Sequence, residues 1–125
     1  MRNKTVLFIL QNLEGGGAEK VFVHIANGFA SNGIDVEILL GENTGDYFNF
    51  LDSRIKISIL NARTFVDYNY KLSSFFRRKC YTFVFTASDY ISAASVIAKF
   101  IIGADFEIIV TLHYYLPYQL SILPH

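Results

Sequence analysis

An apolar run near the start of the sequence, Val6–Leu10 (VLFIL), is followed by QNLEGGGAE at 11–19 and a helical pattern from Lys20 to Asn32. Its five consecutive apolar residues predict a strand that is buried on both faces. A run of β-favouring residues, consecutive glycines and a helical period predict a strand, a tight turn and a helix. Glycines let the backbone approach a ligand closely, and the N–H groups at a helix start attract an anion. We therefore expect a ligand to bind at this junction, at the triplet Gly15, Gly16 and Gly17.

The composition is that of one folded domain without a strong charge. The chain has 125 residues, 52% of them hydrophobic, which is enough for a single core. Eleven basic and eleven acidic side chains cancel, so nucleic acid is not expected as a partner. The single cysteine, Cys80, has no disulfide partner, and no apolar run approaches the roughly 18 residues of a membrane span. These features predict a cytoplasmic protein and leave peripheral contact with the inner face of the membrane open.

Segments with strand and helix patterns alternate along the chain. Strands are predicted at 5–10, 35–40, 54–60, 80–85 and 107–112, helices at 20–32, 68–79 and 90–102, and a turn of helix at 47–51. In the strand at 54–60, isoleucines alternate with polar residues, which indicates the edge of a sheet. The alternation predicts an α/β fold, a Rossmann-like open parallel sheet of order 3-2-1-4-5 with helices on both faces.

The helical patterns also predict which residues are buried. At about 100° per residue, the helix at 20–32 has an apolar arc made of Val21, Phe22, Ile25, Gly28 and Phe29. In the helix at 90–102 only Ser92, Ser95 and Lys99 form a polar strip, so we expect most of that helix to be buried. The basic triplet at 77–79 suits a helix end, where cations meet the negative end of the dipole, and lipid headgroup contact is its alternative role.

Two features lie on one edge of the predicted sheet, the glycine triplet after the first strand and His113 after the fifth. Open α/β sheets bind ligands beyond the carboxyl ends of their strands, where the strand order reverses. An ordinary turn and an ordinary loop histidine are the alternatives. The triplet is not a dinucleotide fingerprint, because Lys20 stands where its last glycine belongs, and it lacks the Gly-Lys-Ser/Thr of a P-loop. No metal-ligand spacing appears, and we expect no cofactor; His24 is interpreted as a surface residue.

The opening stretch resembles the start of the family 4 glycosyltransferases, which have the GT-B architecture of two facing Rossmann-like domains. The likeness is carried by Gly16-Gly17-Ala18-Glu19, Ile25-Ala26-Asn27, Gly33, Val36-Glu37-Ile38 and the strand from Ile108 to His113. It implies transfer of a sugar from a nucleotide-diphosphate sugar to a glycan or lipid-linked acceptor, commonly in surface polysaccharide biosynthesis. It also implies that Gly16 and Gly17 contact the donor diphosphate and that His113 orients the donor sugar. Tyr114, Tyr115 and the loop at 41–53 are expected to contact the acceptor.

Members of that family have a second domain that binds most of the donor. The resemblance therefore implies that residues 1–125 are an incomplete N-terminal, acceptor-side domain, inactive without the C-terminal domain. In such a fragment, the outer side of the helix at 90–102 is expected to be bare and to favour self-association. A non-catalytic module that serves a separate catalytic chain is the alternative. A dinucleotide-binding domain of an oxidoreductase is a third reading, for which we expect no NAD(P)H binding.

Overall fold

The computed structural model describes residues 4–14, 17–45, 47–87 and 89–110. The elements in chain order are β1 (Thr5–Leu10), α1 (Gly17–Ser31), β2 (Asp35–Leu40), the 3-10 helix η1 (Tyr47–Phe50), β3 (Lys56–Ile59), α2 (Phe65–Arg78), β4 (Phe83–Thr86), α3 (Asp89–Ile102) and β5 (Glu107–Val110). All elements predicted from the sequence are present among these residues.

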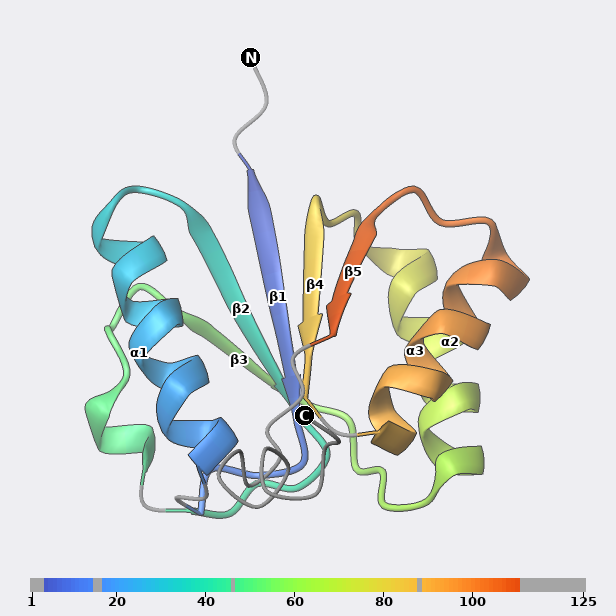
Figure 1. Ribbon diagram of the computed structural model, residues 1–125, viewed down its shortest axis with the longest axis horizontal. Helices are drawn as coiled ribbons and strands as arrows, with labels where there is room; N and C mark the ends of the chain where they lie inside the picture. Colours follow the sequence, from blue (N-terminus) through green and yellow to red (C-terminus); the bar gives the residue numbers. More distant parts are fainter. Residues whose placement is uncertain (1–3, 15–16, 46, 88, 111–125) are drawn as a thin grey trace, which may run out of the picture.

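The strands form one five-stranded parallel sheet in the order β3-β2-β1-β4-β5, as predicted. The central strand is β1, in which Val6 pairs with Val36 of β2 on one side and with Phe83 of β4 on the other. Helix α1 covers one face of the sheet, and α2 and α3 cover the other (Figure 1). The predicted α/β fold class, strand order and placement of helices on both faces are therefore confirmed.

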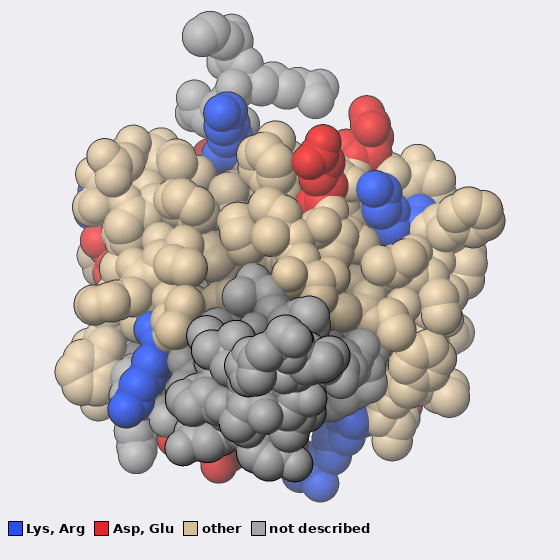
Figure 2. Space-filling model, in the orientation of Figure 1, with Lys and Arg blue, Asp and Glu red and all other residues tan. Residues whose placement is uncertain are grey.

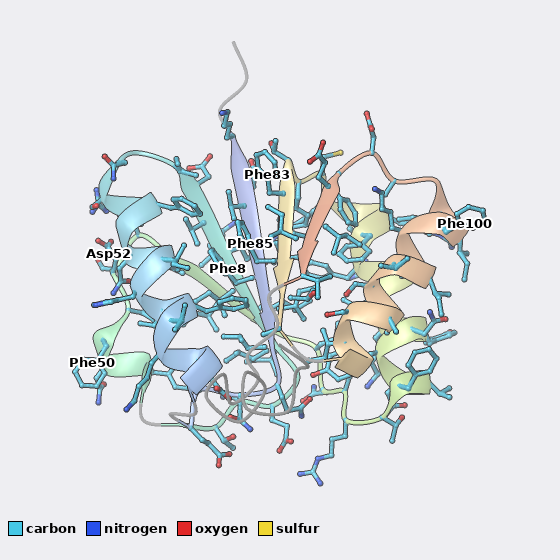
Figure 3. All side chains as sticks on the ribbon, in the orientation of Figure 1. Phe8, Phe50, Asp52, Phe83, Phe85 and Phe100 are labelled. Atoms are coloured by element: carbon cyan, nitrogen blue, oxygen red, sulfur yellow. The ribbon has the colours of Figure 1, made fainter. Side chains whose placement is uncertain are left out.

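A cluster of aromatic rings fills the space between the sheet and α1. Phe8 of β1 stacks on Phe85 of β4 with ring centroids 4.8 Å apart, and Phe22 of α1 meets Phe8 edge-on at 5.2 Å. Figure 3 shows Phe8 and Phe85 pointing from the strands towards α1. Offset-stacked and edge-to-face ring pairs stabilise a core beyond their buried area, so this cluster anchors α1 to the central strands.

The opposite core joins the sheet to α2 and α3. Alternate residues of β1, Leu7 and Ile9, face this side, as expected for a strand that is buried on both faces. Three side chains spaced four residues apart on α2 pack against them: Tyr68, Leu72 and Phe76. From α3, the buried residues include the small Ala94 and Ala98. The amphipathic pattern of α2 thus fixes the side that it turns to the sheet.

Several predicted boundaries differ from the structure. Helix α2 begins at Phe65 and not at position 68, because the side chain of Thr64 accepts a hydrogen bond from the Asp67 N–H at 3.1 Å and caps the helix. Strand β4 begins at Phe83, where its register with β1 begins, and Cys80 is exposed before it. Strand β3 is the predicted edge but spans Lys56–Ile59 alone, and Ile57, expected to point inward, is exposed.

The predicted buried arc of α1 is wrong by about one residue of rotation. Phe22 is buried, but Val21 and Ile25 are exposed, and Val23, Ala26 and Ala30 are buried in their place. Alanines let the helix approach the strands closely. A prediction of the buried side that gives most weight to large apolar residues therefore places too little weight on alanine. The predicted end of the helix is confirmed, since Gly33 has a φ of +81° and the N–H groups of Gly33 and Ile34 donate to carbonyls of the last turn.

In α3 the prediction is reversed. Ser92 and Ser95 of the supposed polar strip are buried, whereas Val96 is 50% and Phe100 is 88% exposed. The serines tolerate burial because Ser95 Oγ donates to the Ile91 carbonyl at 2.7 Å and Ser92 Oγ lies 2.7 Å from Thr86 Oγ1. Figure 3 shows Phe100 pointing away from the protein, and Figure 2 shows mostly uncharged residues over the side where α3 lies. This helix is therefore not mostly buried, and its outer side is apolar.

Candidate functional site

The carboxyl ends of the strands lie together at one edge of the sheet, the lower edge in Figure 1, which we call the rim. Helix α1 begins at Gly17, seven positions after the end of β1 at Leu10, so the predicted strand and helix are present, while Gly15 and Gly16 of the predicted turn lie outside the described residues. The order of the strands reverses here, because β1 has β2 on one side and β4 on the other. This is the place where open α/β sheets bind ligands.

The segment between β1 and the glycines is held by the loop that follows β2. The Glu42 N–H donates to the Gln11 carbonyl at 2.7 Å, and the Leu13 N–H donates to the Thr44 carbonyl at 2.9 Å. The Thr44 hydroxyl donates to a carboxylate oxygen of Glu14 at 2.8 Å. These bonds extend the parallel pairing of β1 and β2 beyond the strands. They fix the direction in which the chain enters the glycine turn.

Gly45 makes this close approach possible. Its φ of +126° disfavours any side chain, and a Cβ at this position would lie 2.0 Å from the Leu13 carbonyl carbon. The glycine is therefore required by both backbone conformation and space. The loop after β2 is built to rest against the segment that leads into Gly15.

A polar network occupies the rim between β1 and the loops after β2 and β3. Gln11 Nε2 donates to Glu42 Oε1 at 2.7 Å and to the Ala62 carbonyl at 3.1 Å, and its Oε1 accepts from the Tyr68 hydroxyl. Glu42 also accepts from Arg63 Nη2 at 3.0 Å. We call Gln11, Glu42, Arg63 and Tyr68 the rim network. It presents a carboxylate and a guanidinium at the edge where a ligand is expected.

The rim network is not among the residues predicted from the sequence, although the sequence carries a signal for it. Gln11 directly follows β1, and Glu42 and Arg63 lie within four residues of the ends of β2 and β3. Polar residues just beyond neighbouring parallel strands meet at one edge of a sheet. The hydroxyl of Tyr68 could not be assigned to the network, because the segment at 61–69 has no clear pattern.

The predicted site residues are only partly within the described residues. Gly17 is the first residue of α1, which places it at the positive end of the helix dipole. Gly15, Gly16, His113, Tyr114 and Tyr115 lie outside the described residues, so their positions stay predictions. The strand that precedes His113 does end at the rim, because Val110 of β5 pairs with Thr86 of β4, and Thr86 pairs with Ile9 of β1.

Other polar residues singled out by sequence lie away from the rim. His24 is exposed on α1, as predicted, and Arg77 and Arg78 are exposed in the last turn of α2. Lys79 differs from its neighbours, since its Nζ lies 3.0 Å from Glu37 Oε1. In the basic triplet, Arg77 and Arg78 are therefore exposed to solvent, and Lys79 forms an ion pair with Glu37.

Glu37 is the centre of a second polar cluster, in the amino-terminal half of β2. Its carboxylate accepts from Ser58 Oγ at 2.6 Å, from Tyr81 Oη at 2.9 Å and from Lys79. Burial raises the pKa of Glu37, but the hydrogen bonds from Ser58, Lys79 and Tyr81 outweigh it, so the pKa is lowered overall. The pKa of Tyr81 is raised, mainly by burial and to a lesser extent by the negative charge of Glu37. We call these four residues the Glu37 cluster. Its polar groups form hydrogen bonds with one another, so its role is structural.

The described residues contain neither a metal-binding cluster nor a membrane-spanning helix. No group of three or more His, Cys, Asp and Glu side chains among them is arranged to hold a metal ion. Within the same residues, no helix combines the length and the apolarity that crossing a bilayer requires.

Neither a protein-family model nor a curated protein matches the sequence. Among solved structures, the chain is similar to the lipopolysaccharide outer core galactosyltransferase WaaB in its apo form, with a TM-score of 0.72 and 20% sequence identity. The match covers 91% of this chain and 34% of the other, so this chain spans about a third of that protein's length. The similarity agrees with the fold that the resemblance to family 4 glycosyltransferases implies. The chain therefore shares its fold with part of a lipopolysaccharide galactosyltransferase.

Proposed function

We propose that residues 1–125 are the N-terminal, acceptor-side part of a glycosyltransferase. The enzyme would move a sugar from a nucleotide-diphosphate sugar to a glycan or lipid-linked acceptor in surface polysaccharide biosynthesis. The observation that carries this proposal is the β1–α1 junction, which stands at the point where the order of a parallel sheet reverses. The fold shared with WaaB, a galactosyltransferase of the lipopolysaccharide outer core, supports the class of reaction and its setting.

The glycine turn supplies the electrostatic part of the proposed chemistry. As the bond between the sugar and the diphosphate breaks, negative charge develops on the leaving phosphate. Backbone N–H groups of Gly16 and Gly17 would donate to that phosphate, and the dipole of the 15-residue helix α1 would add to their effect. The bonds between 11–14 and the loop after β2 hold the segment that leads to these glycines in place before the donor arrives.

His113 supplies the second contact in this proposal. It follows β5, whose carboxyl end lies at the rim, and its imidazole would hydrogen-bond the donor sugar and orient it. Tyr114, Tyr115 and the loop at 41–53 would then contact the acceptor. The protein would act in the cytoplasm, at the inner face of the membrane where lipid-linked acceptors lie. No cofactor and no metal ion are part of the proposed reaction.

The proposal is tested by measuring sugar transfer with the protein made from the whole reading frame that contains these residues. We expect release of nucleoside diphosphate that depends on an acceptor, and a kcat lowered by about a hundredfold in Gly16→Val, because a stabilising phosphate contact is lost. His113→Ala should also lower kcat, whereas His24→Ala, on the exposed side of α1, should not. Turnover by the 125-residue chain alone, or normal rates in Gly16→Val and His113→Ala, would contradict the proposal.

The outer side of α3 favours a second candidate function. Its exposed apolar residues include Val96, Ile97, Phe100 and Ile101. Apolar patches rimmed by polar residues mark interaction surfaces. A non-catalytic module that presents an acceptor or a membrane face to a separate catalytic chain would use such a surface. A frame that stops at His125, together with a second chain whose transfer rate rises when this one is added, would support the module and exclude the fragment.

A further inference from the structure

A groove of about 510 Å³ lies at the rim, between the loops that follow β2 and β3 and the start of α2. Its lining residues in the described part of the chain are all polar, charged or glycine, and they include Glu42, Asn43, Thr44, Asn61, Arg63 and Asp67. None of these residues carries an aliphatic or aromatic side chain that would attract a lipid chain. The groove therefore suits a ligand that is recognised by hydrogen bonds.

The charges of the groove select against anions. Glu42 and Asp67 contribute carboxylates, and the guanidinium of Arg63 lies 3.0 Å from Glu42 and is largely offset by it. Glu14 adds another carboxylate, which accepts from Thr44 at 2.8 Å. Lys71, whose Nζ donates to the Asn61 carbonyl, offsets part of this charge. Among the described residues, the carboxylates of Glu14, Glu42 and Asp67 still outnumber these two cations, and the net negative charge disfavours phosphate and carboxylate groups. The donor diphosphate is therefore not expected in this groove.

The same side chains suit hydroxyl groups. A hydroxyl both donates and accepts, and the groove offers carboxylates that accept, a guanidinium that donates and the amides of Asn43 and Asn61, which do both. Arg63 uses one nitrogen for Glu42 and carries five N–H donors in all. Glu42 is held in place by Gln11 Nε2 at 2.7 Å, so its carboxylate is positioned before a ligand binds.

We propose that this groove binds the acceptor through a neutral, hydroxyl-rich sugar ring, with Glu42 and Arg63 as the pair that recognises neighbouring hydroxyls. The inference rests on the proposed function, whose acceptor it assigns to a chemical class. Thr44 links the groove to the glycine turn, since its carbonyl accepts from the Leu13 N–H at 2.9 Å. A sugar in the groove therefore lies beside the segment that leads to the donor phosphates.

The test compares sugars that share one ring and differ in charge. Amide NMR spectra of the isotope-labelled 125-residue chain are recorded with methyl glucoside, the corresponding glucuronide and the phosphate ester of the same sugar. We expect methyl glucoside to shift the amides at 42–44 and 61–64 and the two anions to bind several-fold more weakly. Equal or tighter binding of the anions, shifts confined to other parts of the chain, or no shifts with any of the three would overturn the assignment.

Variants identify the side chains responsible. Arg63→Met and Glu42→Gln should weaken methyl glucoside binding about tenfold, because each removes charge-assisted hydrogen bonds. Arg54→Met is the matched control, since Arg54 is also an exposed arginine in an ion pair, 2.7 Å from Asp52, but lies outside the groove. Thermal unfolding shows whether each variant is folded. Wild-type affinity in a folded Arg63→Met chain would overturn the assignment.

The failures of the two proposals can be told apart. Glycoside binding that depends on Arg63, with no sugar transfer by the whole reading frame, would reject the glycosyltransferase and keep the groove as a sugar site. Transfer at a normal rate and acceptor KM in Arg63→Met would reject the groove and keep the enzyme.

Discussion

The Glu37 cluster and the rim network both join β2 to its neighbours through a glutamate, but they differ in their access to water. Glu37 is 4% exposed, and its hydrogen-bond partners come from β3 and from the segment that joins α2 to β4. Arg63 of the rim network has a side chain that is 76% exposed and that lines a groove. A buried and satisfied network stabilises the fold, whereas an open one keeps hydrogen-bonding capacity for a ligand. Burial therefore separates a structural cluster from a candidate site.

The largest effect is expected where a buried network is broken. Glu37→Ala should lower the free energy of unfolding by about 3 kcal/mol, because the Tyr81 and Ser58 hydroxyls lose their acceptor in the interior. Glu42→Ala, in the rim network, should cost about 1 kcal/mol, since water can replace the lost partner. Chemical denaturation of both variants measures the difference. Equal losses would show that burial does not distinguish the two networks.

Gly41 tests how tightly the rim network is packed. A Cβ at this position would lie 2.1 Å from Tyr68 Oη and 2.7 Å from Gln11 Oε1, so Gly41→Ala should cost about 2 kcal/mol. Gly28→Ala is the matched control, because nothing lies within 4 Å of its Cβ, and it should stabilise α1 by about 0.5 kcal/mol. Thermal unfolding compares the two. A neutral Gly41→Ala would mean that Tyr68 and Gln11 are not held where the network requires them.

A smaller effect depends on pH. Glu37 has a folded-state pKa below its ordinary value of 4.5, so its contribution to stability is present above that value and is lost as pH falls through the folded-state pKa. Glu37→Gln should cost about 1 kcal/mol at neutral pH, and its deficit relative to the wild type should shrink in acid. Hydrogen bonds from Arg54 lower the pKa of Asp52 to about 2. Asp52 titrates in the same way in both proteins, so its contribution cancels when they are compared. A deficit that grows on acidification would contradict the assigned direction.

The smallest effect on stability is expected at the open end of the rim network. Arg63→Met should change the free energy of unfolding by less than about 0.5 kcal/mol, because the Arg63–Glu42 pair is exposed and screened by solvent. Lys79→Met should cost more, since it leaves the Glu37 carboxylate without its cation. Denaturation curves of the two variants provide the comparison. A large loss in Arg63→Met would make the rim network a structural cluster like that of Glu37.

The sheet could be predicted from the sequence, because its signals are local. The bounds of β1 and β2 agree with prediction, since the apolar residues that finish each strand are followed by Gln11 and by Gly41 respectively. The buried faces of α1 and α3 could not be predicted, because they include alanines in both helices and serines in α3, whereas larger residues such as Phe100 are exposed. A serine that bonds to its own helix, as Ser95 does, gives no sequence signal of burial.

The sheet edge that we call the rim could be located from the sequence, but the polar network on it could not. The glycine turn and the strand before His113 point to the rim from chain order alone. Gln11, Glu42, Arg63 and Tyr68 come from four separate segments, and their meeting depends on the register of β1, β2 and β3 and on the start of α2. A network of this kind becomes visible when the strands are placed side by side.

The central claim is that the glycine turn and His113 face each other at one edge of the sheet. It is tested most directly with a spin label at position 113, in a His113→Cys chain whose exposed Cys80 is replaced by serine. We predict that the label broadens the amide signals of Gly17, Ala18 and Glu19 at the start of α1. Broadening of the signals at 33–36 and 80–82, near the amino ends of the strands, with those of α1's first turn unchanged, would contradict it.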